Sequence, residues 1–83
     1  ADCFGDYYTR GGLDTRRREM ITLCFLAAQG GCEPQLTSHA VANMRVGNDE
    51  RFLIAVVSQC TPYIGYPRTL NALRCIADAA AKA

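Results

Sequence analysis

Residues 32–47, CEPQLTSHAVANMRVG, decide the fold of this chain. Pro34 suits the first helical position, because its missing N–H would be unpaired there in any case. Gly47 suits the position just past the end of a helix, where a left-handed residue is favoured. Between them, one face recurs at helical spacing and contains the only histidine of the chain; its members are Leu36, His39, Ala40, Asn43 and Met44. We therefore expect one helix with its single imidazole on a mostly apolar stripe.

The helix before this stretch is predicted to begin at the N-cap Asp14 and to run to about Gly30. Residues 20–28 are almost entirely apolar, so we expect this helix to be central and buried on most sides. Its first turns contain three positive charges, where the helix macrodipole favours negative ones; they are Arg16, Arg17 and Arg18. They are either a solvated or salt-bridged basic end, or a clamp for an anionic ligand, because guanidinium matches carboxylate geometry.

Two further helices are predicted after residue 47. The first follows the capping sequence Asn48-Asp49-Glu50 and runs to about Tyr63, with Pro62 expected to disrupt its last turn. The second opens at Pro67 and runs to about residue 80. The faces that recur at helical spacing are Phe52, Val56, Gln59, Cys60 and Tyr63 in the first helix, and Leu70, Leu73, Ile76 and Ala77, expected inward, in the second.

The remaining N-terminal residues are weakly patterned, and Phe4, Tyr7 and Tyr8 would suit a short helix that docks on the body. No segment shows the alternation of a β-strand. The predicted fold class is therefore all-α, with helical hairpins, about four to five helices and short connections. With 83 residues, we expect a single domain over residues 1–83.

Composition limits the partners of this domain. Hydrophobic residues make up 49% of a short chain, which favours a homo-oligomer. The formal charge of +1 argues against nucleic acid and membrane surfaces as partners. No apolar run has the length of a membrane helix, and no signal peptide is seen. Because the chain begins at Ala1 and not at Met, a targeting segment that precedes it would not be visible.

Five cysteines, at positions 3, 24, 32, 60 and 75, include no Cys-x-x-Cys pair. Cys24, Cys60 and Cys75 fall in helical patterns among apolar neighbours, where cysteine is usually a small core residue. The odd number and the spacing do not suggest a disulfide framework. We therefore expect a reducing, cytoplasmic location.

Several residues are candidates for chemistry, each with a structural alternative. His39 is either a hydrogen-bonded core residue or a general acid–base, and metal binding is not expected because paired ligands are lacking. Cys32 precedes a helix, where a thiolate is favoured, or it is an ordinary cap residue. Glu19 is a proton relay or the counter-charge of the arginines. Gln59 and Tyr63, four apart on one face, bind a ligand or bridge helices.

Three stretches in this order resemble the carboxymuconolactone decarboxylase family, within the alkylhydroperoxidase-D-like superfamily. LDTRRREMITLCFLAA is similar to the opening helix of the family, LTSHAVANMRVGNDE to its histidine helix, and QCTPYIGYPRTLNAL to its Gln-x-x-x-Tyr-x-Gly-x-Pro signature. The resemblance runs from Leu13 to about Ala77. It implies an all-α homo-oligomer, a trimer or a ring of six, with active sites near subunit contacts. It also implies a cofactor-free loss of carbon dioxide from a small unsaturated lactone acid.

The redox branch of the superfamily contains Cys-x-x-Cys-x-x-x-His. On that pattern, His39 takes the histidine and Cys32 the first cysteine, but Gln35 replaces the second cysteine. Glu19 roughly takes the place of the glutamate that this branch uses. The decarboxylase branch lacks the cysteine pair and keeps the histidine, which is closer to this chain.

Three functional hypotheses follow. The first is a lyase, in which an arginine among residues 16–18 holds a substrate carboxylate, His39 donates a proton, and Gln59 and Tyr63 orient the substrate. The second is a thiol-dependent peroxidase with peroxiredoxin activity, in which Cys32, alone or with Cys60 or a cysteine from another subunit, attacks a peroxide or disulfide and His39 and Glu19 relay the proton. The third is a non-catalytic oligomeric module that binds a ligand or a partner.

Overall fold

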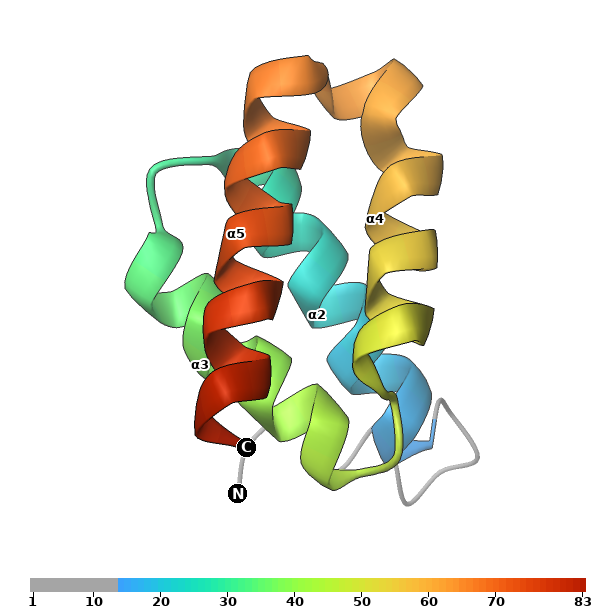
Figure 1. Ribbon diagram of the computed structural model, residues 1–83. Helices are drawn as coiled ribbons and strands as arrows, with labels where there is room; N and C mark the ends of the chain where they lie inside the picture. Colours follow the sequence, from blue (N-terminus) through green and yellow to red (C-terminus); the bar gives the residue numbers. More distant parts are fainter. Residues whose placement is uncertain (1–13) are drawn as a thin grey trace, which may run out of the picture.

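The computed structural model describes residues 14–83, which form four helices and contain no strand (Figure 1). The helices are α2 (Thr15–Gln29), α3 (Glu33–Arg45), α4 (Glu50–Ile64) and α5 (Tyr66–Lys82). The all-α class is confirmed for this part of the chain. The short helix expected around Phe4, Tyr7 and Tyr8 lies outside the described residues. Within residues 14–83, no helix has both the length and the apolar character needed to cross a membrane.

The four helices pack as a bundle in which α2 and α5 separate the other two. α3 contacts both α2 and α5, and α4 contacts the same two helices. Figure 1 shows α3 and α4 on opposite sides of the molecule. Side chains that point outward from α3 and from α4 therefore leave the bundle on different sides.

Two aspartates fix where helices begin. Asp14 is the N-cap of α2, and its Oδ1 accepts a hydrogen bond of 2.8 Å from the backbone N–H of Arg17. Asp49 caps α4 in the same way, with Oδ1 accepting from the N–H of Phe52 at 2.9 Å. Each carboxylate satisfies an N–H that has no partner inside its helix. Both predicted starts are confirmed.

Helix α3 begins at Glu33, one residue before the predicted start at Pro34, and ends before Gly47 as predicted. It follows Cys32, with Pro34 in its first turn. It ends in a turn where Gly47 has a φ of 104°, a backbone conformation that other residues rarely adopt. The residues that α3 buries are Leu36, Ala40 and Asn43, all on the predicted stripe.

Two predicted boundaries of the second half are corrected. Pro62 does not disrupt the last turn of α4, which continues through it to Ile64. The missing N–H of proline removes only the bond to the carbonyl of Ser58, and Ser58 is an exposed residue. The next helix, α5, begins at Tyr66 and not at Pro67, immediately after Gly65.

The buried faces of three helices differ from the prediction. α2 is not buried on most sides, because Phe25 is 70% exposed. On α4 the predicted face is half-buried at Val56 and Cys60 and exposed elsewhere, with Tyr63 89% exposed, and the fully buried residues are Leu53 and Val57. On α5, Ile76 is buried as predicted and Leu73 packs half-buried against the core, but Leu70 is 46% exposed and Ala77 is exposed as well. Apolar residues occupy more than one face of each helix, so the face that meets its neighbours is decided by packing and not by periodicity.

The core is built from one stripe of each helix. Leucine, isoleucine and valine side chains fill its centre, and alanines let the helices approach closely. The buried hydrophobic residues are Leu23, Ala27, Leu36, Ala40, Leu53, Val57, Ala72, Cys75, Ile76 and Ala79.

We expect Asp49→Ala to lower the free energy of unfolding by about 1 kcal/mol, because the N–H of Phe52 loses its acceptor. Glu50→Ala is the matched control, since it also removes one exposed carboxylate from the first turn of α4 but no cap. Its effect should be limited to a few tenths of a kcal/mol, from the macrodipole. Urea denaturation at one fixed protein concentration measures both. Equal losses for the two variants would contradict the capping role.

Candidate active site around His39

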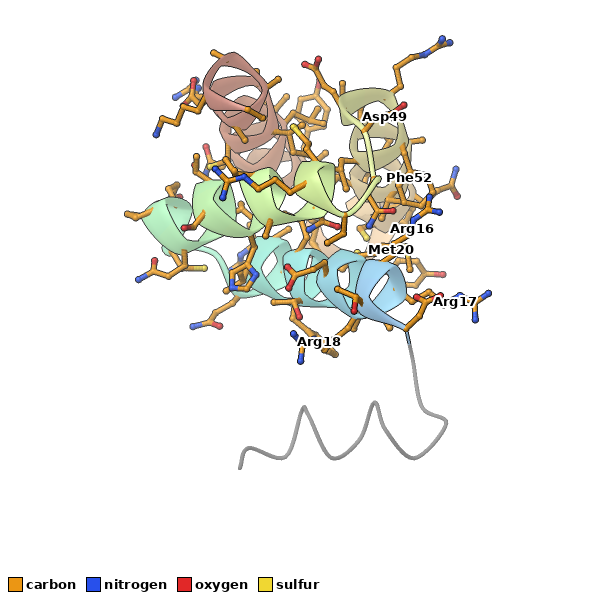
Figure 2. The ribbon with its side chains drawn as sticks, turned by 90° about the horizontal axis from the view of Figure 1, so that it is seen from below. Arg16, Arg17, Arg18, Met20, Asp49 and Phe52 are labelled. Carbon is orange, nitrogen blue, oxygen red and sulfur yellow. The ribbon has the colours of Figure 1, made fainter. Side chains whose placement is uncertain are left out.

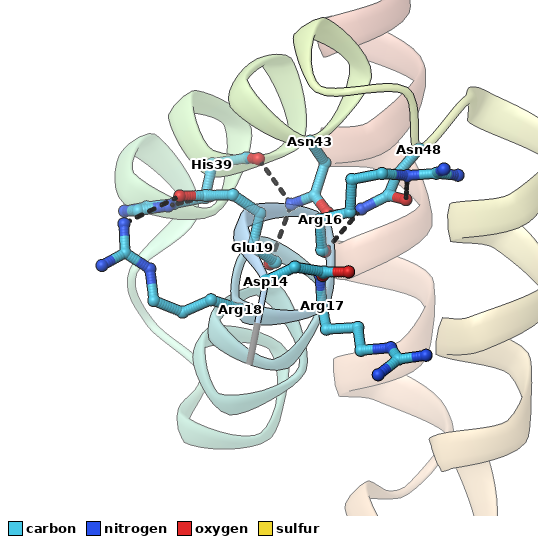
Figure 3. A network of polar contacts seen from close by, with 8 residues as sticks. All are labelled: Asp14, Arg16, Arg17, Arg18, Glu19, His39, Asn43 and Asn48. Carbon is cyan, nitrogen blue, oxygen red and sulfur yellow. Dashed lines mark hydrogen bonds and ion pairs between the residues drawn. The ribbon is translucent and has the colours of Figure 1, made fainter. Parts of the chain in front are cut away.

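His39 on α3 meets Glu19 on α2, and this contact is the centre of the candidate site (Figure 3). His39 Nδ1 lies 2.9 Å from Glu19 Oε1. Because a carboxylate oxygen only accepts, Nδ1 is the atom that carries the hydrogen in this pair. Glu19 is 8% exposed, whereas the side chain of His39 is 40% exposed. A buried carboxylate thus orients an imidazole whose other nitrogen, Nε2, is left for an external partner.

Arg18 extends the pair to a third charged group. Its Nη2 lies 3.8 Å from Glu19 Oε2, so the two carboxylate oxygens face an imidazole and a guanidinium, respectively. Burying a carboxylate is costly unless its oxygens are paired, and these two neighbours offset that cost. Glu19 therefore serves as counter-charge to an arginine and as partner of His39 at the same time.

The backbone beneath this pair is held by two buried asparagines (Figure 3). Asn43 Nδ2 donates to the carbonyl of Glu19 at 2.9 Å and to the carbonyl of His39 at 2.7 Å. Its Oδ1 accepts from Asn48 Nδ2 at 2.9 Å, and Asn48 Nδ2 also donates to the carbonyl of Arg16 at 2.8 Å. The amide of Asn43 therefore ties α2 at Glu19 to α3 at His39.

The surface near His39 is an open hollow of about 350 Å³, lined by Pro34, Gln35, Ser38 and His39. A larger groove of about 760 Å³ lies between α3 and α5 and contains charges of both signs, among them Arg45 and Asp78. The residues that line that groove include neither His39 nor Glu19. The larger groove is therefore separate from the acid–base pair of the candidate site. Within residues 14–83, no three His, Cys, Asp or Glu side chains gather into a group that would hold a metal ion.

The three arginines of α2 do not act as one group. Figure 2 shows Arg16 and Arg17 on the side of Phe52, and Figure 3 shows Arg18 turned the other way, toward Glu19. Arg16 donates to the carbonyl of Gly47 over 3.4 Å, and with Arg17 it borders a separate hollow of about 270 Å³. Successive helical residues point about 100° apart, so only one of the three accompanies Glu19 to His39.

Comparison with protein families gives one match, to the carboxymuconolactone decarboxylase family over residues 3–78. The chain belongs to the carboxymuconolactone decarboxylase family. The match begins at residue 3, which is before Leu13, the first residue of the three similar stretches. Comparisons with curated proteins and with solved structures found no match.

The cysteine that the redox branch of the superfamily would use lies at the N-cap of α3. Cys32 Sγ donates to the carbonyl of Leu26 at 3.2 Å and makes no side-chain cap for its own helix. Its sulfur is therefore engaged as a hydrogen-bond donor toward the end of α2. Glu19, which in the sequence roughly takes the place of the glutamate of that redox branch, does contact His39.

Gln59 and Tyr63, from the signature that resembles the carboxymuconolactone decarboxylase family, lie on the exposed surface of α4. Since α4 and α3 are on opposite sides of the bundle (Figure 1), a single chain does not bring these two residues to His39. The structure thus joins His39, Glu19 and Arg18, and leaves Cys32, Arg16, Arg17, Gln59 and Tyr63 apart from them.

Sequence reasoning missed the structural importance of Asn43 and Asn48. Asn43 lies on the apolar stripe of α3, and a buried amide needs partners for all its polar atoms. An asparagine on an apolar stripe was therefore the feature of the sequence that could have indicated a buried hydrogen-bonding residue. The sequence also placed Asn48 in a capping segment, whereas Asp49 makes the cap and Asn48 is 3% exposed.

Asn43→Ala should lower the free energy of unfolding by about 1–3 kcal/mol, because it removes the buried hydrogen bond from α3 to the carbonyl of Glu19 and takes away the Asn43 Oδ1 acceptor of the buried Asn48 amide. The control is Asn71→Ala, because Asn71 is exposed on α5 and the change in helix propensity is the same. Its effect should stay within about 0.5 kcal/mol. Chemical denaturation at equal protein concentration compares them. Equal stability of the two variants would contradict the bridging role of Asn43.

Proposed function

We propose that this protein catalyses the cofactor-free loss of carbon dioxide from a small unsaturated lactone acid, with His39 as the proton donor. The observation that supports this most directly is the 2.9 Å contact between His39 Nδ1 and Glu19 Oε1. A carboxylate on Nδ1 orients the imidazole, and in the imidazolium form Nε2 carries a transferable proton. Membership of the carboxymuconolactone decarboxylase family supplies the reaction class.

Each residue of the site has a separate part in this reaction. Arg18 binds a carboxylate of the substrate, since it is the arginine beside Glu19. Carbon dioxide leaves with cleavage of its carbon–carbon bond, and the electron pair stays on the unsaturated lactone. His39 Nε2 then donates its proton to that carbon, and solvent reprotonates the imidazole. Glu19 acts as a positioning residue through Nδ1.

The proposal includes a homo-oligomer, a trimer or a hexamer, in which another copy closes the site. The hollow beside His39 is open in a single chain, and loss of a charged carboxylate is favoured when water is excluded. Large apolar side chains remain uncovered on other surfaces, which is typical of subunit contacts; they are Phe25, Phe52, Ile54, Tyr63, Tyr66 and Leu70. Gln59 and Tyr63 would reach a substrate only from a neighbouring copy.

Thiol-dependent peroxide reduction through Cys32 is the second candidate in rank. Two observations place it below decarboxylation. The sulfur of Cys32 donates to the carbonyl of Leu26, and Gln35 stands where the redox pattern has its second cysteine. A non-catalytic binding module is third, because such a role does not require the contact between Glu19 and His39.

His39→Ala is expected to lower kcat for decarboxylation by about 10²–10⁴, because the proton donor is lost. Release of carbon dioxide from a carboxylated unsaturated lactone measures turnover. Ser38→Ala, in the same hollow, is the matched control and should leave turnover near that of the wild type. Circular dichroism checks that each variant keeps its helices. Unchanged turnover in His39→Ala, or no turnover by the wild-type protein, would contradict the proposal.

Arg18→Ala should raise KM about tenfold to a hundredfold, since a charge-assisted hydrogen bond contributes about 1.5–3 kcal/mol. Arg17→Ala removes the neighbouring arginine, which points to another side of α2 (Figure 3), and should change KM little. Steady-state kinetics of the same reaction separate the two. A larger effect of Arg17→Ala than of Arg18→Ala would contradict the assignment of the carboxylate to Arg18.

A further inference from the structure

Cys24 on α2 and Cys60 on α4 face each other across the contact between their helices. Their Sγ atoms lie 3.9 Å apart, and both are free thiols. Both residues are partly exposed, so solvent molecules reach the pair. The other cysteines of residues 14–83 are engaged elsewhere: Cys32 donates to the carbonyl of Leu26, and buried Cys75 lies 3.7 Å from the carbonyl of Glu33.

We propose that Cys24 and Cys60 form a dithiol site that exchanges with low-molecular-weight disulfides and ends as an intramolecular disulfide between α2 and α4. A disulfide requires sulfurs about 2.05 Å apart on side chains that already point toward one another. Here the two sulfurs already lie 3.9 Å apart, so the two side chains have to close less than 2 Å to form the bond. The site uses none of the residues proposed for decarboxylation, and the two proposals stand or fall separately.

The order of the two steps follows from the surroundings of Cys24. The pKa of Cys24 is raised to about 12. Burial of the thiol is the larger cause, and the neighbouring Cys60 is the second. Cys24 is therefore slow to become a thiolate while Cys60 is free, and Cys60 is the thiol that attacks first. Once Cys60 is bound in a mixed disulfide, it no longer carries the charge that opposes ionisation of Cys24.

The exchange balances in atoms and electrons. Cys60 loses its proton to solvent and attacks one sulfur of the small disulfide, whose S–S bond breaks; the released thiolate takes a proton from solvent. Cys24 then loses its proton, attacks the Cys60 sulfur and expels the second small thiol, which is protonated in turn. Two protein thiols are oxidised, and one small disulfide is reduced to two thiols.

This bond would close residues 24–60 into a covalent loop that contains the whole of α3. The histidine helix would then be bracketed by a link between α2 and α4, and the oxidised protein should unfold at a higher temperature than the reduced one. Disulfides that form reversibly in reducing compartments are typically redox-responsive, which suits a pair on partly exposed helices.

The test uses the full chain equilibrated with mixtures of reduced and oxidised glutathione, then alkylated and digested with trypsin. We expect the loss of two of the five thiols and a disulfide that joins peptides 19–45 and 52–68, assigned by fragmentation to Cys24 and not Cys32. Retention of all five thiols in the most oxidising mixture would overturn the proposal, as would a link made through Cys32.

Serine variants test the order of attack. Cys24→Ser should stop at a mixed disulfide, with one glutathione on Cys60, whereas Cys60→Ser should leave Cys24 unmodified. Cys32→Ser is the control and should form the link as the wild type does. Equal uptake of glutathione by Cys24→Ser and Cys60→Ser would overturn the assigned order. The linked wild-type peptides decide the site itself, so a serine variant that fails to fold does not affect that result.

Discussion

The buried amide of Asn43 is the constraint on which the fold and the candidate site both depend. Apolar contacts are non-directional and would tolerate a shift of α2 along α3. Hydrogen bonds do not tolerate it, because Asn43 donates to one carbonyl on each helix, those of Glu19 and His39. These are the two residues whose side chains meet at 2.9 Å. The contact that fixes the register of the helices is therefore also the contact that aligns the acid–base pair.

The limits of the helices were predictable because their signals are local. Asp14, Asp49, Pro34 and Gly47 each act on the backbone within a few residues, and the structure places all four within one residue of where the sequence indicated. The buried faces were not predictable in the same way. α4 has apolar residues around most of its circumference, and the choice of Leu53 and Val57 over the face of Tyr63 depends on where α2 and α5 lie.

The candidate site was predictable in its members and not in its geometry. His39 and Glu19 stand out as the single imidazole and the lone acid near an apolar run, but they are separated by twenty residues and meet only because α2 packs against α3. Three consecutive arginines look equivalent in a sequence. The rotation of the helix sends them to different sides, and packing decides that Arg18 is the one that reaches Glu19.

The arrangement also explains why a single chain is an incomplete site for the proposed reaction. An imidazole in contact with bulk water gains little from preorganised charges, since water screens them. Glu19 is already withdrawn from solvent, whereas the hollow beside His39 is open. The fold has no spare element in residues 14–83 to cover that hollow, because α4 lies on the opposite side of the bundle. Its uncovered apolar side chains, such as Phe25 and Tyr63, are the surface that neighbouring copies would cover in the proposed oligomer. In the proposed oligomer, closure by a neighbouring copy would exclude water from the proton donor of so small a domain.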